Sequence, residues 1–383
     1  MTYDFDKIIS RCNTNSVKWD THPNILPMWV ADMDFETAPA VKAAVQRRAE
    51  HGVFGYVHVP DTYYEAIINW FNRRHHWQMK KEWIIYTTGV VPAISAIIKA
   101  MTQPGDGVLI QTPVYNCFFS SIKNNGCNVI KNELVYHDNT YSIDFEDLEQ
   151  KASDPSTKVM ILCNPHNPAG RVWTLEELKH IGDICIRHQV FVIADAIHCE
   201  LIMPGYEYIP FASISKEFEQ HSATCSSPSK SFNIAGLQIA NITISDDAIR
   251  RRVDRAIKTN EVENVNPFGI EALMAAYNES EDWLRQLNLY IYSNYQYLCD
   301  FFSTNLPQFP VTKLEGTYLV WIDISVLNKS SKAVTKELLT QENIWLNEGV
   351  MYGASGDKFV RLNIACPRQT LTDGLIRIKR AWG

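Results

Sequence analysis

The chain has 383 residues, of which 46% are hydrophobic and 21% are charged, and its formal net charge is −7. This composition is typical of a folded globular protein and argues against a disordered or fibrous chain, while the acidic balance argues against a general nucleic-acid or membrane-surface binder. The length exceeds that of one compact core, so we predict a large domain over residues 46–275 and a small domain formed by residues 1–45 and 276–383.

The cysteines and the first residues of the chain indicate the cellular compartment. Nine cysteines are scattered along the chain without a CxxC pair. Such an odd, unpatterned set favours a reducing cytoplasm and predicts neither disulfides nor a metal site. The chain starts with polar and acidic residues, and no stretch reaches transmembrane length. We therefore expect neither a signal peptide nor a membrane span.

Residues 83–245 repeat a short apolar run, a loop and a longer helical pattern, which is typical of a largely parallel α/β sheet. The predicted strands, of which the first four are followed by helices, are 83–86, 108–111, 159–163, 190–194, 223–226 and 238–244. The later pattern predicts a long helix, two short strands and a closing helix, the first three at 281–304, 318–324 and 359–364. Residues 1–45 show little regular pattern, so we expect them to wrap over the small domain. Parallel sheets bind ligands outside the carboxyl ends of their strands, which makes those ends the first place to look for a site.

Two features follow the first two predicted strands. Gly89 precedes a helix that opens with Val90 and Val91. The free amides and the dipole at such a helix end suit a phosphate, although bare helix N-termini are common. Tyr115 follows the second strand, where its ring either packs on a flat cofactor or, as is more usual, belongs to the core.

The third and fourth strands deliver polar side chains to the same edge. The third leads into the loop Cys163–Arg171, after which Thr174 and Glu177 predict a capping box. A tight loop explains the prolines and the glycine but does not require two asparagines. Asp195 follows the fourth strand, and it is either a helix cap or ion-pair residue, or the anion that keeps a pyridinium nitrogen protonated.

Lys230 follows the fifth strand, among small hydroxyl residues. A loop lysine is usually a surface charge, but at the carboxyl end of a strand it can be a desolvated amine nucleophile. Ser227 and Ser229 are placed to donate to a phosphate. Arg361 lies in an apolar strand of the small domain, which predicts either an interface salt bridge or a bidentate grip on a substrate carboxylate.

Taken in order, these features resemble the class I/II aminotransferase superfamily over nearly the whole chain. The matching pieces are Gly89–Val91, Tyr115, the Asn-Pro-His-Asn-Pro-x-Gly loop, Asp195-x-x-His198, Ser-x-Ser-Lys230 and Arg361. Finer matches at Met28–Phe35, Phe54–Tyr56 and Gly316–Tyr318 resemble its cystathionine β-lyase and cystalysin branch. The resemblance implies the fold of pyridoxal-5′-phosphate (PLP) transferases, an α/β fold whose large domain has a mainly parallel sheet flanked by helices, with a smaller α+β domain.

The resemblance also implies the roles of the site residues. Lys230 would carry PLP as a Schiff base, Asp195 would lie on the pyridine nitrogen and Tyr115 on the ring. Near the phenolic oxygen we expect Asn167 and His198. The phosphate would be bound by Val90, Val91, Ser227, Ser229 and, from the neighbouring subunit of a homodimer, Tyr56. The substrate carboxylate would be held by Arg361, the amide of Ala31 and Asn167.

The implied activity is α,β-elimination of cystathionine, cysteine or related S-substituted cysteines to a thiol, pyruvate and ammonia, with Lys230 removing the Cα proton. Two alternatives stay open: an aminotransferase, and a regulatory or binding protein that keeps PLP without turnover. The chain departs from the branch pattern at Ala169, Ala196, Ser231 and Asn116–Cys117. The last pair lies beside Tyr115, so we expect a shifted substrate preference.

Overall fold

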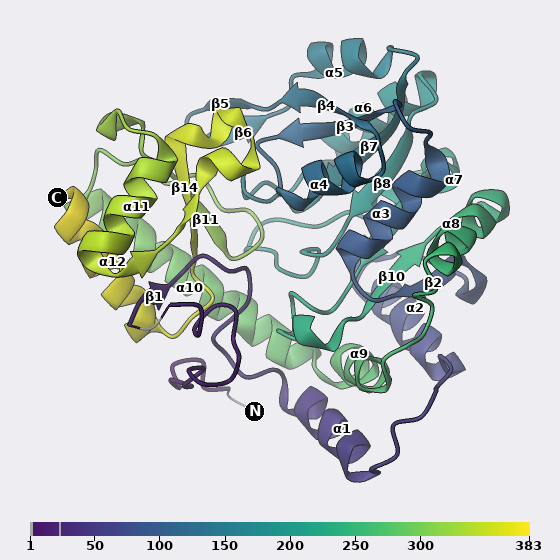
Figure 1. The fold of residues 1–383 in the computed structure, drawn as a ribbon, viewed down its shortest axis with the longest axis horizontal. Coiled ribbons are helices and arrows are strands. Elements are labelled where there is room, and N and C mark those ends of the chain that lie inside the picture. The colour runs from purple at the N-terminus through teal and green to yellow at the C-terminus, as the bar shows by residue number, and fades with distance from the viewer. Residues whose placement is uncertain (1–2, 23) are drawn as a thin grey trace.

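The computed structural model describes residues 3–22 and 24–383, so residues 1–2 and 23 of the predicted N-terminal segment lie outside the described residues. The described residues form a larger body around a seven-stranded sheet and a smaller body around a three-stranded sheet (Figure 1). The strands are β1 Leu26–Pro27, β2 Ile84–Thr87, β3 Gly107–Thr112, β4 Asn128–Glu133, β5 Val135–His137, β6 Thr140–Ser142, β7 Thr157–Cys163, β8 Phe191–Asp195, β9 Ser222–Ser226, β10 Ala240–Thr243, β11 Leu319–Asp323, β12 Ile344–Trp345, β13 Asn347–Glu348 and β14 Phe359–Asn363. The α-helices are α1 Pro39–Glu50, α2 Asp61–His75, α3 Val90–Met101, α4 Cys117–Asn124, α5 Phe145–Ala152, α6 Leu175–Arg187, α7 Lys216–Gln220, α8 Asp247–Thr259, α9 Pro267–Glu279, α10 Glu281–Asn305, α11 Ser331–Glu342 and α12 Arg368–Trp382.

The large sheet has the strand order β2-β10-β9-β8-β7-β3-β4. Its strands run parallel except β10, which is antiparallel to both β2 and β9. This confirms the predicted largely parallel sheet and the six predicted strands, the last of which is shorter than expected. The edge strand β4 was not predicted. It has few apolar residues and is largely solvent-facing, so its sequence lacks the apolar run that marks the central strands.

Helices cover both faces of this sheet, and strand alternation decides which way each side chain points (Figure 1). In β8, Ile193 packs on the face covered by α3, α4 and α8. Val192 and Ala194 pack on the opposite face, covered by α5, α6 and α7. Asp195, two positions after Ile193, therefore points toward the face that carries α3.

Local signals explain how the two helices beside the site begin. The capping box at the start of α6 is confirmed, since the side chains of Thr174 and Glu177 each accept a backbone N–H of the other residue. At α3 the N-cap is Gly89, which has no side chain to bond the first-turn amides. The start of α3 thus presents free backbone donors at the carboxyl edge of the sheet.

The smaller body is built on β11, β14 and β13, which pair antiparallel. The N-terminal segment reaches this body, because β1 pairs parallel with β12, as expected of a segment that wraps over it. The predicted domain limits remain predictions, and both fall inside helices, α1 and α9, that pack against each other. Across the described residues, none of the helices is both long and apolar enough to cross a bilayer.

Candidate active site

Four of the predicted site residues, Tyr115, Asp195, Lys230 and Arg361, gather where the carboxyl edge of the large sheet meets the small sheet. Asp195 ends β8, and Lys230 follows its neighbour β9. The charges of Asp195 and Arg361 both act on the amine of Lys230, and the same two charges act on the hydroxyl of Tyr115. His198 is within reach of Lys230 and Arg361. The structure therefore brings together side chains from four separate parts of the chain.

Lys230 is not a surface lysine. Its side chain is partly buried, and its amine donates a 2.5 Å hydrogen bond to the carbonyl oxygen of Ala31. The loss of water around the amine lowers its pKa to about 8, even though the carboxylates of Asp32 and Asp195 act in the opposite direction. Near neutral pH a sizeable share of the amine is thus unprotonated, as a nucleophile or a general base requires.

Asp195 is a buried carboxylate that lacks a cationic partner. Only 4% of the residue is exposed, and the backbone N–H of Ile197 donates to its side chain at 3.0 Å. Among the described residues it forms no ion pair, and a turn rather than a helix follows it, so neither structural explanation from the sequence holds. Burial raises its pKa to about 7. A cationic group bound beside it would restore its ionised form.

The turn after β8 carries His198, which is also buried. Its Nδ1 has no hydrogen-bond partner in the part of the chain that the structure describes. Burial lowers the pKa of His198 to about 3, so the ring is neutral at physiological pH. Next to it, Glu200 accepts hydrogen bonds from α2 at 2.6–2.7 Å, the donors being Trp70, Arg74 and His75. These contacts anchor the turn that carries His198.

The loop Cys163–Arg171 uses its two asparagines differently. The side-chain oxygen of Asn164 accepts the backbone N–H of Trp173 at 3.1 Å, which closes the loop. Asn167 instead accepts from Nη1 of Arg361 at 3.1 Å. Asn164 is therefore a structural residue, whereas Asn167 reaches the opposite wall of the site and keeps its amide N–H groups available as donors.

Arg361 comes from β14 and is 3% exposed. Its Nη2 donates to the carbonyl of Trp29 at 2.8 Å, and its guanidinium lies over the ring of Tyr352 at 5.1 Å. Its Nε has no partner, and no carboxylate pairs with it, among the described residues. A buried guanidinium without an anion is a ready site for a carboxylate ligand, and the predicted interface salt bridge is absent from these contacts.

The predicted phosphate site lies at the start of α3 and after β9. Val90 and Val91 are the first two residues of α3, where backbone amides have no intrahelical acceptor. The hydroxyl of Ser227 donates to the carbonyl of Ile239 at 2.5 Å and accepts the N–H of Ser229 at 3.0 Å. Donation by Ser227 to a phosphate therefore requires it to leave Ile239, and the phosphate roles of both serines stay predictions.

The two predicted aromatic residues are in contrasting positions. Tyr115 is partly buried beside the site, with its ring edge-on to Phe118 at 5.8 Å. Tyr56 is 97% exposed, in the loop between α1 and α2. Within one chain Tyr56 is free of the site, as expected if it serves a neighbouring subunit.

Sequence reasoning missed several polar residues that hold the site walls. Tyr318 donates to the carbonyl of Ala31 at 3.0 Å. Asn363 donates to the carbonyls of Val30 and Asp32, both at 2.6 Å. Asn363 had a signal, because it alternates with Arg361 on one face of an otherwise apolar strand. Ala31 was predicted through its amide, but the contact that the structure shows is made by its carbonyl.

The donor set fits PLP. Asp195 is a buried anion without a cation, the amine of Lys230 is partly neutral, and Nδ1 of His198 lacks a partner. The uncapped start of α3 suits a phosphate. A pyridine nitrogen, an aldehyde, a phenolic oxygen and a phosphate would answer these four features in turn.

Comparisons with known proteins agree with this site. Residues 23–378 match the family model described as aminotransferase class I and II. The chain is 42% identical to the cystathionine beta-lyase PatB of Bacillus subtilis (strain 168), covering 99% of each chain, and 33% identical to the protein MalY of Escherichia coli (strain K12), covering 97% of each. The crystal structure of cystalysin from Treponema denticola, which contains pyridoxal 5′-phosphate, superposes with a TM-score of 0.97 at 37% identity, covering 100% of this chain and 99% of that one. These matches confirm the expected fold.

Proposed function

Because the chain belongs to the class I and II aminotransferase family, and to its carbon-sulfur lyase branch, we propose that it is a PLP-dependent carbon-sulfur β-lyase. The substrates are cystathionine, cysteine or related S-substituted cysteines, and the products are a thiol, pyruvate and ammonia. One observation carries the proposal: the same site holds the partly neutral amine of Lys230 and the buried carboxylate of Asp195, which forms no ion pair among the described residues.

The residues divide the work between them. PLP, when bound, supplies a protonated ring that stabilises negative charge developing at the substrate Cα. Asp195 holds the proton on the ring nitrogen, and as its carboxylate is buried the interaction is not screened by water. His198 and the amide of Asn167 would donate to the phenolic oxygen of the cofactor. Tyr115 would cover one side of its ring and keep water from that side.

Lys230 and Arg361 act on the substrate itself. Arg361, held by Asn167 and by the carbonyl of Trp29, binds the substrate carboxylate and so fixes the Cα–H bond. The neutral amine of Lys230 takes the Cα proton. A thiolate then leaves from Cβ, and the released aminoacrylate is hydrolysed to pyruvate and ammonia.

We also propose that the enzyme works as a homodimer with shared sites. Val53, Phe54 and Tyr56 form an apolar, exposed stretch of the loop between α1 and α2. Exposed apolar stretches of this kind favour burial against a partner. In the dimer, Tyr56 of each subunit would donate to the phosphate in the neighbouring site, a role that its exposure permits.

The cysteines support a cytoplasmic location. All nine cysteines are free thiols in the structure, and most are buried. Free thiols persist in a reducing compartment. We therefore propose that the enzyme is cytoplasmic.

The assay that tests the function measures pyruvate and thiol released from L-cystathionine, with and without a 2-oxo acid as amino acceptor. The β-lyase releases both products in equal amounts without the acceptor. Amination of the 2-oxo acid without release of pyruvate and thiol would instead identify an aminotransferase. PLP absorbance without turnover of any amino thioether would identify a binding protein. A panel with cysteine, cystine and S-alkyl cysteines then ranks the substrates.

A further inference from the structure

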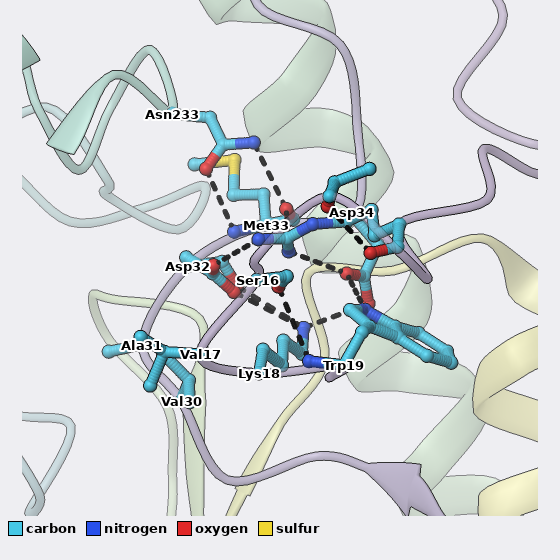
Figure 2. A network of polar contacts seen from close by, with 12 residues as sticks. Ser16, Val17, Lys18, Trp19, Val30, Ala31, Asp32, Met33, Asp34 and Asn233 are labelled. Atoms are coloured by element: carbon cyan, nitrogen blue, oxygen red, sulfur yellow. Dashed lines mark hydrogen bonds and ion pairs between the residues drawn. The ribbon is translucent and has the colours of Figure 1, made fainter. Parts of the chain in front are cut away.

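A cluster of four buried or half-buried charged side chains lies next to Ala31, the residue whose carbonyl accepts the amine of Lys230. Asp32 and Asp34 come from the segment Met28–Phe35, and Arg11 and Lys18 come from residues 3–22, which we call the amino-terminal arm. Figure 2 shows side chains of the arm converging on the two carboxylates. The side chain of Lys18 is 1% exposed and that of Asp34 is 5% exposed, so these charges are held inside the protein.

The contacts of this charge cluster are short and reciprocal. Arg11 donates to Asp32 at 2.6 Å and to Asp34 at 3.0 Å. Lys18 donates to Asp34 at 2.8 Å and lies 3.5 Å from Oδ1 of Asp32. The indole of Trp19 also donates to Asp34, at 2.8 Å. Each carboxylate is thus shared by two cations of the arm, which fixes the side chains of Asp32 and Asp34.

The segment Met28–Phe35 also makes hydrogen bonds with Lys230 and with the loop that carries it. Ala31, next to Asp32, accepts the amine of Lys230 at 2.5 Å. Met33, between the two aspartates, is bonded through its N–H and its carbonyl by the side chain of Asn233, at 3.1 and 3.0 Å (Figure 2). Asn233 lies three positions after Lys230. The charge cluster and the lysine loop therefore hold one short stretch of backbone between them.

We propose that Asp32, fixed by Arg11 and Lys18 of the amino-terminal arm, is a positioning residue for Lys230: it holds the Ala31 carbonyl against the amine and keeps a negative charge beside it. The inference rests on the proposed function. Its consequence is that the arm, although distant in sequence from the sheet edge, tunes the base that removes the Cα proton.

The charges around the amine of Lys230 support the same role for Asp32. The groups that act on the Lys230 amine come from four elements, and they are Asp32, Arg361, Asp195 and Cys117. After desolvation, which lowers the pKa of the amine, Asp32 has the largest effect and raises it. Oδ1 of Asp32 is buried and, among the described residues, accepts no hydrogen bond, although Lys18 lies 3.5 Å from it.

The test is a pH titration of the visible absorbance of bound PLP, which reports the proton on the nitrogen of Lys230, in Asp32→Asn holoenzyme. The variant keeps the shape of the side chain and its contact with Arg11 but removes the charge. We expect full PLP content, a midpoint about one pH unit lower than in the wild type, and a lower kcat. An unchanged midpoint would overturn the proposal, as would loss of PLP together with a lower melting temperature, which marks a purely structural role.

The arm is tested with Lys18. Lys18→Met leaves Asp34 short of a buried cation, so the double variant Lys18→Met/Asp34→Asn, which removes both charges, guards against simple misfolding. We expect kcat to fall about 10-fold in the double variant with PLP retained. The single variant Lys18→Arg, which keeps the positive charge beside Asp34, should keep the wild-type kcat. Lys42→Met, which breaks an exposed ion pair with Glu36, is the matched control and should behave as the wild type. Wild-type kcat in the double variant would refute the role of the arm.

Failure of this inference can be distinguished from failure of the proposed function. If the wild type released no thiol from any amino thioether, the proposed function would fail, but the midpoint in Asp32→Asn would still test the placement of Asp32 beside Lys230.

Discussion

The guanidinium of Arg361 donates a hydrogen bond to the side-chain oxygen of Asn167 across 3.1 Å, although 194 positions separate the two residues. Arg361 comes from the small sheet and Asn167 from the loop after β7 of the large sheet, so this contact joins the two walls of the site. It also leaves the amide N–H groups of Asn167 available as donors, as the proposed role of Asn167 beside the cofactor requires.

Arg361→Lys keeps the charge but loses the planar fork, so one of the two contacts with Asn167 and Trp29, or the grip on the carboxylate, must be lost. We expect kcat/KM for cystathionine to fall about 10- to 100-fold, mostly through KM, with PLP absorbance unchanged. Steady-state kinetics measures this. Arg285→Lys, at a residue with a 62% exposed side chain, is the matched control. An unchanged KM in Arg361→Lys would remove Arg361 from the substrate site.

Asp195→Asn should weaken PLP binding and lower kcat together, by about 100-fold or more, because the amide cannot hold a proton on the ring nitrogen. The same change should stabilise the cofactor-free chain. Burial raises the pKa of Asp195 from 3.8 to about 7, so the folded chain binds this proton more tightly than the unfolded chain does. Stability is then lost as pH rises between these two values.

Melting temperatures of the cofactor-free proteins check this. Wild type and Asp195→Asn should melt alike at about pH 4, and the variant should melt several degrees higher at about pH 7.5. Lys230 has the opposite sign: burial lowers its pKa from 10.5 to about 8, so its contribution to stability grows as pH rises between them. Equal melting temperatures at about pH 7.5 would mean that Asp195 is ionised and satisfied without the cofactor.

Mixed dimers test the place of Tyr56. A chain with Lys230→Ala and a chain with Tyr56→Ala should each have little activity alone. In a hybrid dimer one site combines an intact Lys230 with the intact Tyr56 of the other chain. Refolding an equal mixture should therefore restore about a quarter of wild-type activity. If mixing restores nothing although hybrids form, Tyr56 does not serve the neighbouring site.

The large sheet and the gathering of its site residues were predictable from sequence for a simple reason. Parallel strands end at one edge, so Tyr115, Asn167, Asp195 and Lys230 had to meet once their strands were recognised. The apolar runs made those strands easy to find. The polar edge strand β4 had no such run and was missed.

The other wall of the site was harder to predict. The amine of Lys230 bonds the carbonyl of Ala31, 199 positions away, and a backbone carbonyl has no residue type that would reveal it. The charge pairs of Arg11 and Lys18 with Asp32 and Asp34 join segments whose proximity depends on the tertiary fold. Roles defined by contact with PLP, such as those of Ser227 and Val91, remain predictions, because they concern a molecule that the sequence does not contain.

Lys230 is the residue that we expect to hold the cofactor, and the proposed function depends on it most. Borohydride reduction of the holoenzyme followed by peptide mass mapping tests this directly. We predict one pyridoxyl group per chain, on the peptide that contains Ser227–Phe232, and no label in Lys230→Ala, which should also have no turnover while keeping its fold. A pyridoxyl group on any other peptide of the wild type would contradict the account.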